Sequence, residues 1–174
     1  MDLASYVRDV PDFPKEGIVF KDIMPLVGNP EAFREAVKQM ADPWRDKGVT
    51  HVVAAEARGF IFGTPIAMEL DAGFAALRKP GKLPYKTKSV TYDLEYGTDT
   101  LCIHEDAVGP NDKVLIVDDL LATGGTIEGA AQLVRDLGAG IVGIQFLIEL
   151  GFLNGRKRLP VGVQVESVIN YAGE

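Results

Sequence analysis

The 174-residue sequence has few of the residues that cross-link small proteins or bind metals. It has one cysteine, Cys102, which excludes a disulfide framework and a multi-cysteine zinc site. Its two histidines, His51 and His104, are far apart and lack metal-ligand spacing. No basic stretch followed by an apolar run begins the chain, and polar residues interrupt the longest apolar stretch, 141–153. We therefore expect no secretory signal, no membrane span and a cytoplasmic protein.

Basic residues are also in short supply. Eighteen lysines and arginines against 25 acidic residues give a formal net charge of −7, so we expect no nucleic-acid binding. Five of the basic residues nevertheless fall in the acid-free window 78–88, RKPGKLPYKTK. A solvated loop would account for this window, and so would a site for a di- or polyphosphate.

Apolar stretches of strand length alternate with helical patterns along the chain. Strands are predicted over 18–20, 49–55, 74–77, 113–117, 141–148 and 163–169, and helices over 2–8, 29–48, 60–70 and 126–137. Pro43 is expected to kink or break the second helix, and 87–104 resembles a hairpin or flap around Gly97. The alternation predicts one α/β domain over 1–174, with a central, mostly parallel sheet flanked by helices.

The segment 114–126, VLIVDDLLATGGT, carries the strongest chemical signal. A buried-type strand is followed by Asp118 and Asp119, and a small loop then opens a helix at Thr126. A glycine-rich helix N-terminus binds phosphate through its unpaired N–H groups. Carboxylates beside that phosphate would bind hydroxyls or a cation instead. The pattern therefore predicts a ribose 5-phosphate, and the competing interpretation is an acidic cap on an ordinary helix.

VDDLLATGGT (117–126) resembles the signature of the type I phosphoribosyltransferases, which bind phosphoribosyl pyrophosphate. Four more segments resemble those family members that act on adenine, in order and spacing: PDFPKEGIVFKDIMPL (11–26), EARGFIFG (56–63), RKPGKLP (78–84) and YDLEYGTD (92–99). The resemblance implies the family's fold, with a small hood from the N-terminal segment and a flexible flap over about 83–99. It also implies that adenine and phosphoribosyl pyrophosphate give AMP and pyrophosphate, with Mg²⁺, in a homodimer.

The resemblance assigns roles to residues of this sequence. Asp118 and Asp119 would hold the ribose hydroxyls. The 5-phosphate would lie on Ala122, Thr123, Gly124, Gly125 and Thr126. Pyrophosphate would meet Glu56, Ala57, Arg58, Gly59, Arg78, Lys79 and Lys82, with a cis peptide at Glu56–Ala57 or within one residue of it. Adenine would meet Val19, Phe20, Lys21 and Arg58.

Within the adenine site, Phe20 would stack on the purine, and backbone groups around Val19 and Lys21 would read its edge. The flap's Glu95 would exchange a proton with the purine, so Glu95 and Arg58 are the candidate catalytic residues. No protein cluster is assigned to Mg²⁺, which substrate oxygens and water would hold.

Three alternatives remain at this point. The first is a phosphoribosyltransferase for a 6-oxopurine, which would need different donors and acceptors around the base. The second is a non-catalytic regulator that binds phosphoribosyl pyrophosphate. Such a regulator would need an added DNA-binding segment and a basic face. The third is a plain structural α/β domain, which would leave the Asp118–Thr126 segment unexplained. An assay with each purine separates these alternatives.

Overall fold

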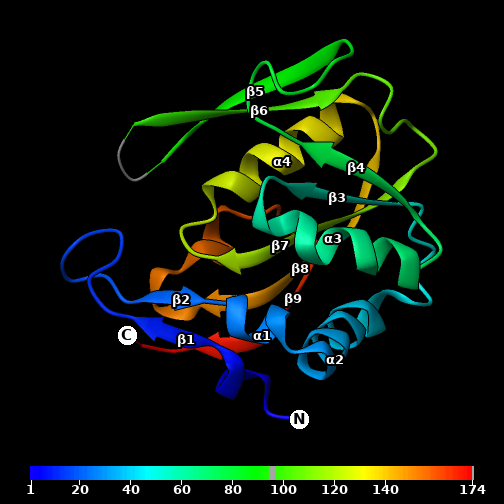
Figure 1. The fold of residues 1–174 in the computed structure, drawn as a ribbon. Helices are drawn as coiled ribbons and strands as arrows, with labels where there is room; N and C mark the ends of the chain where they lie inside the picture. Colours follow the sequence, from blue (N-terminus) through cyan, green and yellow to red (C-terminus); the bar gives the residue numbers. More distant parts are fainter. Residues whose placement is uncertain (95–96, 174) are drawn as a thin grey trace.

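A five-stranded, all-parallel sheet forms the centre of the structure (Figure 1). The computed structural model describes residues 1–94 and 97–173. The strands lie in the order β4-β3-β7-β8-β9. Their bounds are β3 His51–Ala55, β4 Gly73–Leu77, β7 Lys113–Leu121, β8 Gly140–Leu150 and β9 Gln164–Tyr171. The predicted α/β class and parallel sheet are confirmed.

Helices cover both faces of this sheet (Figure 1). The helix α4, Gly125–Asp136, packs on one face, where Ile127 and Val134 join the core. On the other face lie α2, Pro30–Ala41, and α3, Arg58–Glu69, preceded by the short α1, Met24–Gly28. Because each face is covered, the central strands are apolar along nearly their whole length rather than alternating.

The start of α2 follows the sequence prediction, whereas the helix predicted over 29–48 ends earlier, at the break expected near Pro43. The Asn29 side chain accepts hydrogen bonds from the N–H groups of Glu31 and Ala32, both at 3.0 Å. The helix ends at Ala41, and a 3-10 turn, η2 Asp42–Trp44, carries Pro43. This turn delivers Trp44 into the core, where its Nε1 donates to Gln145 Oε1 at 2.8 Å.

A small antiparallel ribbon forms the hood, from β1 Arg8–Val10 and β2 Phe20–Asp22. It lies on the side to which the arrowheads of β3, β7 and β8 point (Figure 1). The prediction of a helix over 2–8 is wrong: a 3-10 turn, η1 Leu3–Tyr6, ends when the Val7 N–H bonds to the Ala4 carbonyl. The predicted strand at 18–20 begins only at Phe20, since pairing with Val10 starts there.

The hairpin expected around Gly97 is present as β5 Thr87–Asp93 and β6 Thr98–His104. Arg78 and Cys102 exchange two backbone hydrogen bonds, at 3.0 and 2.8 Å, and these join the hairpin to the end of β4. Tyr92 is only 7% exposed, and its ring lies where a side chain at Gly129 of α4 would be. The flap expected over 83–99 therefore includes a strand that is anchored to α4.

No helix in residues 1–94 and 97–173 combines the length and the apolar character that crossing a membrane would need.

Candidate active site

The strand β7 is longer than predicted and carries both aspartates within it. Backbone pairing with β8 continues through Asp118↔Phe146 to Leu121↔Glu149, four residues beyond the predicted end at Val117. Consecutive strand residues point to opposite faces. Asp118 and Asp119 therefore project in different directions from one strand, rather than side by side from a loop.

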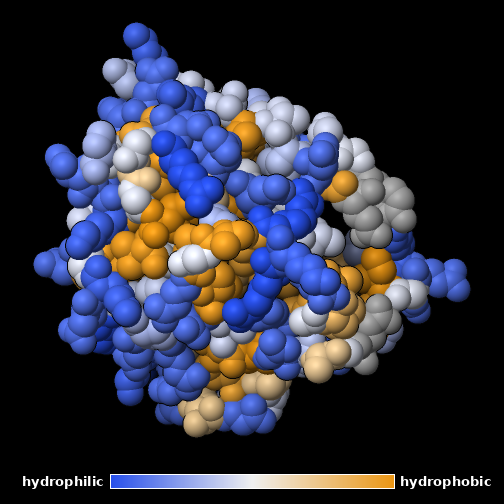
Figure 2. All heavy atoms as spheres, turned by 180° about the vertical axis from the view of Figure 1, so that it is seen from behind, coloured by the Kyte–Doolittle hydropathy of each residue, from blue (hydrophilic) through white to orange (hydrophobic). Residues whose placement is uncertain are grey.

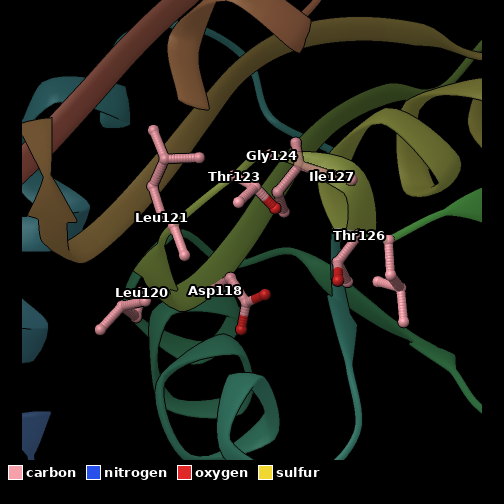
Figure 3. Close-up of a pocket in the computed structure, with 10 residues that line it drawn as sticks. Asp118, Leu120, Leu121, Thr123, Gly124, Thr126 and Ile127 are labelled. Carbon is pink, nitrogen blue, oxygen red and sulfur yellow. The ribbon is translucent and has the colours of Figure 1, made fainter. Parts of the chain in front are cut away.

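The loop after β7, which is predicted to bind an anion, is a tight turn that opens α4. Gly124 has a φ of +89° and caps α4, which begins at Gly125 rather than at Thr126. The first N–H groups of a helix have no partner within it, and they carry the positive end of the helix dipole. Asp118, Thr123, Gly124 and Thr126 line one pocket with Leu120 (Figure 3). A turn of this kind can hold an anion, and here it lies beside Asp118.

The two carboxylates have unusual electrostatics. Burial raises the pKa of Asp118 well above its ordinary value, and the charge of Asp119 adds to this effect. Burial also raises the pKa of Asp119, although the Arg58 guanidinium opposes it. The Asp118 Oδ1 atom accepts the Asp119 N–H at 2.9 Å and would lie 2.9 Å from a Cβ at Gly59. Asp118 therefore reaches the first turn of α3, where only a glycine leaves room.

Arg58 links the predicted adenine and ribose sites. Its Nε lies 2.9 Å from Asp119 Oδ2, and its Cζ lies 5.1 Å from the centroid of the Phe20 ring. A guanidinium at this distance over an aromatic ring makes a cation–π contact. Three predicted residues from the hood, α3 and β7 are thus in direct contact. The cis peptide predicted at Glu56–Ala57, immediately before Arg58, is confirmed.

Glu56 joins the end of β3 to the basic window. Its Oε1 accepts the Lys79 N–H at 2.6 Å and lies 3.4 Å from Arg78 Nε, and these contacts lower the pKa of Glu56. The Lys79 ammonium pairs with Asp99 of the hairpin. The interpretation of 78–88 as a solvated loop is therefore wrong for Arg78 and Lys79, whose charges have carboxylate partners. Lys82 lies in the same turn, where its carbonyl accepts Arg78 Nη1 at 3.3 Å.

The side chain of Lys21 points away from Phe20. Its Nζ lies 2.8 Å from Asp9 Oδ1 and 4.3 Å from the centroid of the Tyr171 ring, and the residue is buried. Val19 and Lys21 line a cavity of about 320 Å³ with Leu150 and Phe152. Because alternate strand residues face opposite sides, neither side chain shares the Phe20 face. Only their backbone groups could therefore serve a purine stacked on Phe20, and this role stays a prediction.

Some residues at the site carried no recognisable sequence signal. Leu94, at the hairpin turn, and Leu120, in β7, line the same pocket as the phosphate loop. Leu94, between two acidic residues, and Leu120, beside Leu121, are both typical of ordinary core or loop positions, so only the assembled fold shows their place. The predicted catalytic Glu95 lies outside the described residues.

The described residues fit a magnesium ion whose ligands would come mainly from substrate and water. They contain no group of three or more histidine, cysteine or acidic side chains that could hold a metal. Asp118 and Asp119 are two carboxylates at the predicted ribose position, and Arg58 pairs with Asp119. Mg²⁺ usually keeps several waters and takes one or two carboxylates together with substrate phosphates. Of these two carboxylates, Asp118 is the one that is not paired with Arg58 and could take part in holding such an ion.

Comparisons with known proteins show the family of this chain. The model of the phosphoribosyl transferase domain matches residues 29–167. The adenine phosphoribosyltransferase of Solidesulfovibrio magneticus is 60% identical over 159 residues, which are 91% of this chain and 93% of that protein. The crystal structure of adenine phosphoribosyltransferase from Thermoanaerobacter pseudethanolicus is 49% identical, with a TM-score of 0.94 and 98% of each chain covered.

A structure with lower sequence identity contains bound ligands. The adenine phosphoribosyltransferase of Saccharomyces cerevisiae, in complex with adenine and an imino-altritol bisphosphate, is 36% identical, with a TM-score of 0.90 and 96% of each chain covered. The sequence and the fold agree along nearly the whole length of these proteins. The chain therefore belongs to the phosphoribosyl transferase domain family and, within it, to the adenine phosphoribosyltransferases.

Proposed function

We propose that the residues described above divide phosphoribosyl pyrophosphate and adenine among four adjoining subsites. The 122–126 loop binds the 5-phosphate through N–H groups and threonine hydroxyls, and Asp118 and Asp119 accept the ribose hydroxyls. The 56–59 turn binds pyrophosphate, with Arg78, Lys79 and Lys82 beside it. Phe20 stacks on adenine. The contact of Arg58 with both Asp119 and Phe20 carries this proposal, because it joins a residue proposed to bind ribose to one proposed to bind adenine.

The protein is a purine salvage enzyme, which converts adenine and phosphoribosyl pyrophosphate to AMP and pyrophosphate. In that transfer the bond between C1 of ribose and pyrophosphate oxygen breaks, and its electron pair leaves with pyrophosphate. Adenine N9 forms the new bond to C1 and loses its proton. Positive charge develops on the sugar, so preorganised negative groups nearby stabilise the transition state. In our proposal, Asp118 and Asp119 supply that charge, and the cationic groups near 56–59 stabilise the leaving pyrophosphate.

Magnesium would be held by Asp118, ribose hydroxyls and pyrophosphate oxygens, and it would neutralise charge on the leaving group. This assignment explains how a chain with a net charge of −7 can bind a highly anionic substrate. We also place the enzyme in the cytoplasm, since its single cysteine is buried and unpaired, as suits a reducing compartment.

An assay of the pure protein with each purine tests the proposed substrate. We expect turnover with adenine, phosphoribosyl pyrophosphate and Mg²⁺, followed as AMP formation, and little or none with hypoxanthine, guanine or xanthine. A chain that turns over a 6-oxopurine instead would contradict the adenine assignment. A chain that binds phosphoribosyl pyrophosphate without turnover would be a regulator.

We further propose a homodimer whose interface lies near Arg78. Two large apolar side chains are exposed and are available for contact with a second subunit. Tyr85, in the basic window, is 56% exposed, and Met68 of α3 is 83% exposed. Hydrophobic side chains also gather in the centre of the face opposite to that of Figure 1 (Figure 2). Apolar surface of this kind often marks an interface. We expect a dimer by analytical ultracentrifugation at micromolar concentration, and a monomer there would contradict the proposal.

A further inference from the structure

The predicted phosphate loop rests directly on a second backbone segment, η4 Gly155–Arg158. Gly155 is buried, and a Cβ placed on it would lie 2.2 Å from the Ala122 carbonyl oxygen. In the other direction, a Cβ on Gly124 would lie 2.5 Å from the Gly155 carbonyl oxygen. Real Cβ atoms do not approach other atoms so closely. The two backbones therefore touch where neither residue can carry a side chain.

A buried acidic residue fixes this second segment to the sheet. Glu149, near the end of β8, is 5% exposed and accepts Arg156 Nε and Nη2, both at 2.7 Å. Ser167 Oγ of β9 donates to the same carboxylate at 2.8 Å, and Arg156 Nη1 donates to the Val165 carbonyl at 3.1 Å. A two-pronged guanidinium–carboxylate pair has a defined geometry as well as strength. Gly155, which precedes Arg156, is thereby held in one position.

The same segment also reaches the hairpin. Arg158 Nε donates to Glu128 Oε2 in the first turn of α4 at 2.9 Å, and its Nη2 donates to the Asp93 carbonyl at 3.1 Å. A Cβ on Gly125 would lie 3.1 Å from Arg158 Nη1. The segment 155–158 therefore touches the phosphate loop, the start of α4 and the end of β5.

We propose that Gly155 and the Glu149–Arg156 pair are positioning residues for the 5-phosphate subsite. Phosphate binding requires several N–H groups of 122–126 to point at one place. The loop itself has two glycines and small side chains, so it has little packing of its own to hold that shape. The backbone of Gly155 supplies the missing support, and the Glu149–Arg156 pair fixes Gly155. This inference rests on the proposed function, because it assumes that 122–126 binds the 5-phosphate.

Gly155→Ala tests the proposal most directly, with AMP and adenosine as probes in titration calorimetry. These two ligands differ only in the 5-phosphate, so the ratio of their affinities reports that subsite and not general folding. The added methyl must displace the Ala122 carbonyl. In enzymes, a displacement of about 1 Å in a positioning element can lower the reaction rate up to ~100-fold. We expect AMP affinity to fall about tenfold or more and adenosine affinity to change less than about twofold.

Gly109→Ala is the matched control, because a Cβ there would meet nothing within 4 Å and the φ is not positive. We expect this variant to keep the wild-type ratio of AMP to adenosine affinity. A folded Gly155→Ala variant with the wild-type ratio would overturn the inference. Wild-type protein that binds AMP and adenosine equally would instead contradict the proposed phosphate site itself.

Arg156→Lys provides a second test if Gly155→Ala does not fold. Lysine keeps the charge but cannot make the two-pronged contact with Glu149. We expect a severalfold higher KM for phosphoribosyl pyrophosphate, with kcat and the KM for adenine unchanged. Unchanged KM values for both substrates would overturn the role of the pair. Equal rises in both KM values would also overturn it. They would indicate a general loss of structure, which does not single out the phosphate-bearing substrate.

Discussion

Replacing Asp118 and Asp119 together by Asn is expected to weaken phosphoribosyl pyrophosphate binding by roughly 100-fold or more, and adenine binding far less. Each carboxylate would accept a hydroxyl of the ribose, and a hydrogen bond to a charged group contributes about 1.5–3 kcal/mol. Two such bonds account for the expected loss. In our proposal, adenine is held mainly by Phe20 and backbone groups of the hood. The substitutions reach these groups only through Arg58, the partner of Asp119, which also lies over Phe20. Titration calorimetry with each ligand measures both effects.

A second acidic pair serves as the control for this variant. Glu105 and Asp106 are adjacent and exposed, so replacing them by Gln and Asn removes the same charge without touching the site. The control should bind phosphoribosyl pyrophosphate as the wild type does. If the Asp118/Asp119 variant loses adenine and phosphoribosyl pyrophosphate affinity equally, the two residues are not the ribose ligands.

The raised pKa of Asp118 makes the single variant Asp118→Asn informative about stability. The folded protein favours the protonated form of this carboxyl, so its contribution to stability is present at low pH and is lost as pH rises through the raised pKa. At neutral pH the variant should therefore melt higher than the wild type, by about 2–4 °C for ~1 kcal/mol in a chain of this size. The difference should vanish at acidic pH. A lower melting temperature at neutral pH would contradict this account.

Changing Glu95 to Ala is expected to lower kcat by about 100-fold or more and to leave phosphoribosyl pyrophosphate affinity nearly unchanged. Proton transfer by a positioned carboxyl contributes on the order of 10²–10⁴ in rate, and it does so only in the transition state. The 5-phosphate, ribose and pyrophosphate ligands lie on other residues. Steady-state kinetics with both substrates varied, together with direct binding, separate the two quantities.

Glu105→Ala is the matched control, because Glu105 is an exposed glutamate that follows the far end of the same hairpin. It should keep wild-type kcat. Wild-type turnover in the Glu95 variant would remove its catalytic role, and it would leave the assignments of Asp118, Asp119 and 122–126 unaffected.

The sequence by itself determined the order along the chain of the strands of the central sheet and of the three longer helices, although not the short β1 and α1, and it predicts the chemistry of the loop after β7. Local signals were sufficient for these features: Asn29 caps α2, Pro43 ends it, and the glycines after Asp119 open a loop before α4. Residue types adjacent in the chain also predict that phosphate-binding and hydroxyl-binding groups lie together. Such features depend on neighbours a few residues away, which a linear sequence displays.

The tertiary structure alone decided which distant groups meet. Pairing with β8 extends β7 past both aspartates, and this separates their directions. Arg58 contacts Asp119 and Phe20. Lys21, although adjacent to Phe20 in the chain, contacts Asp9 and Tyr171 instead. The support of the phosphate loop by Gly155 joins segments about 30 residues apart through bare backbone, which leaves no side-chain pattern to read. These contacts depend on how sheets and helices pack, and packing is a property of the whole chain rather than of any window in it.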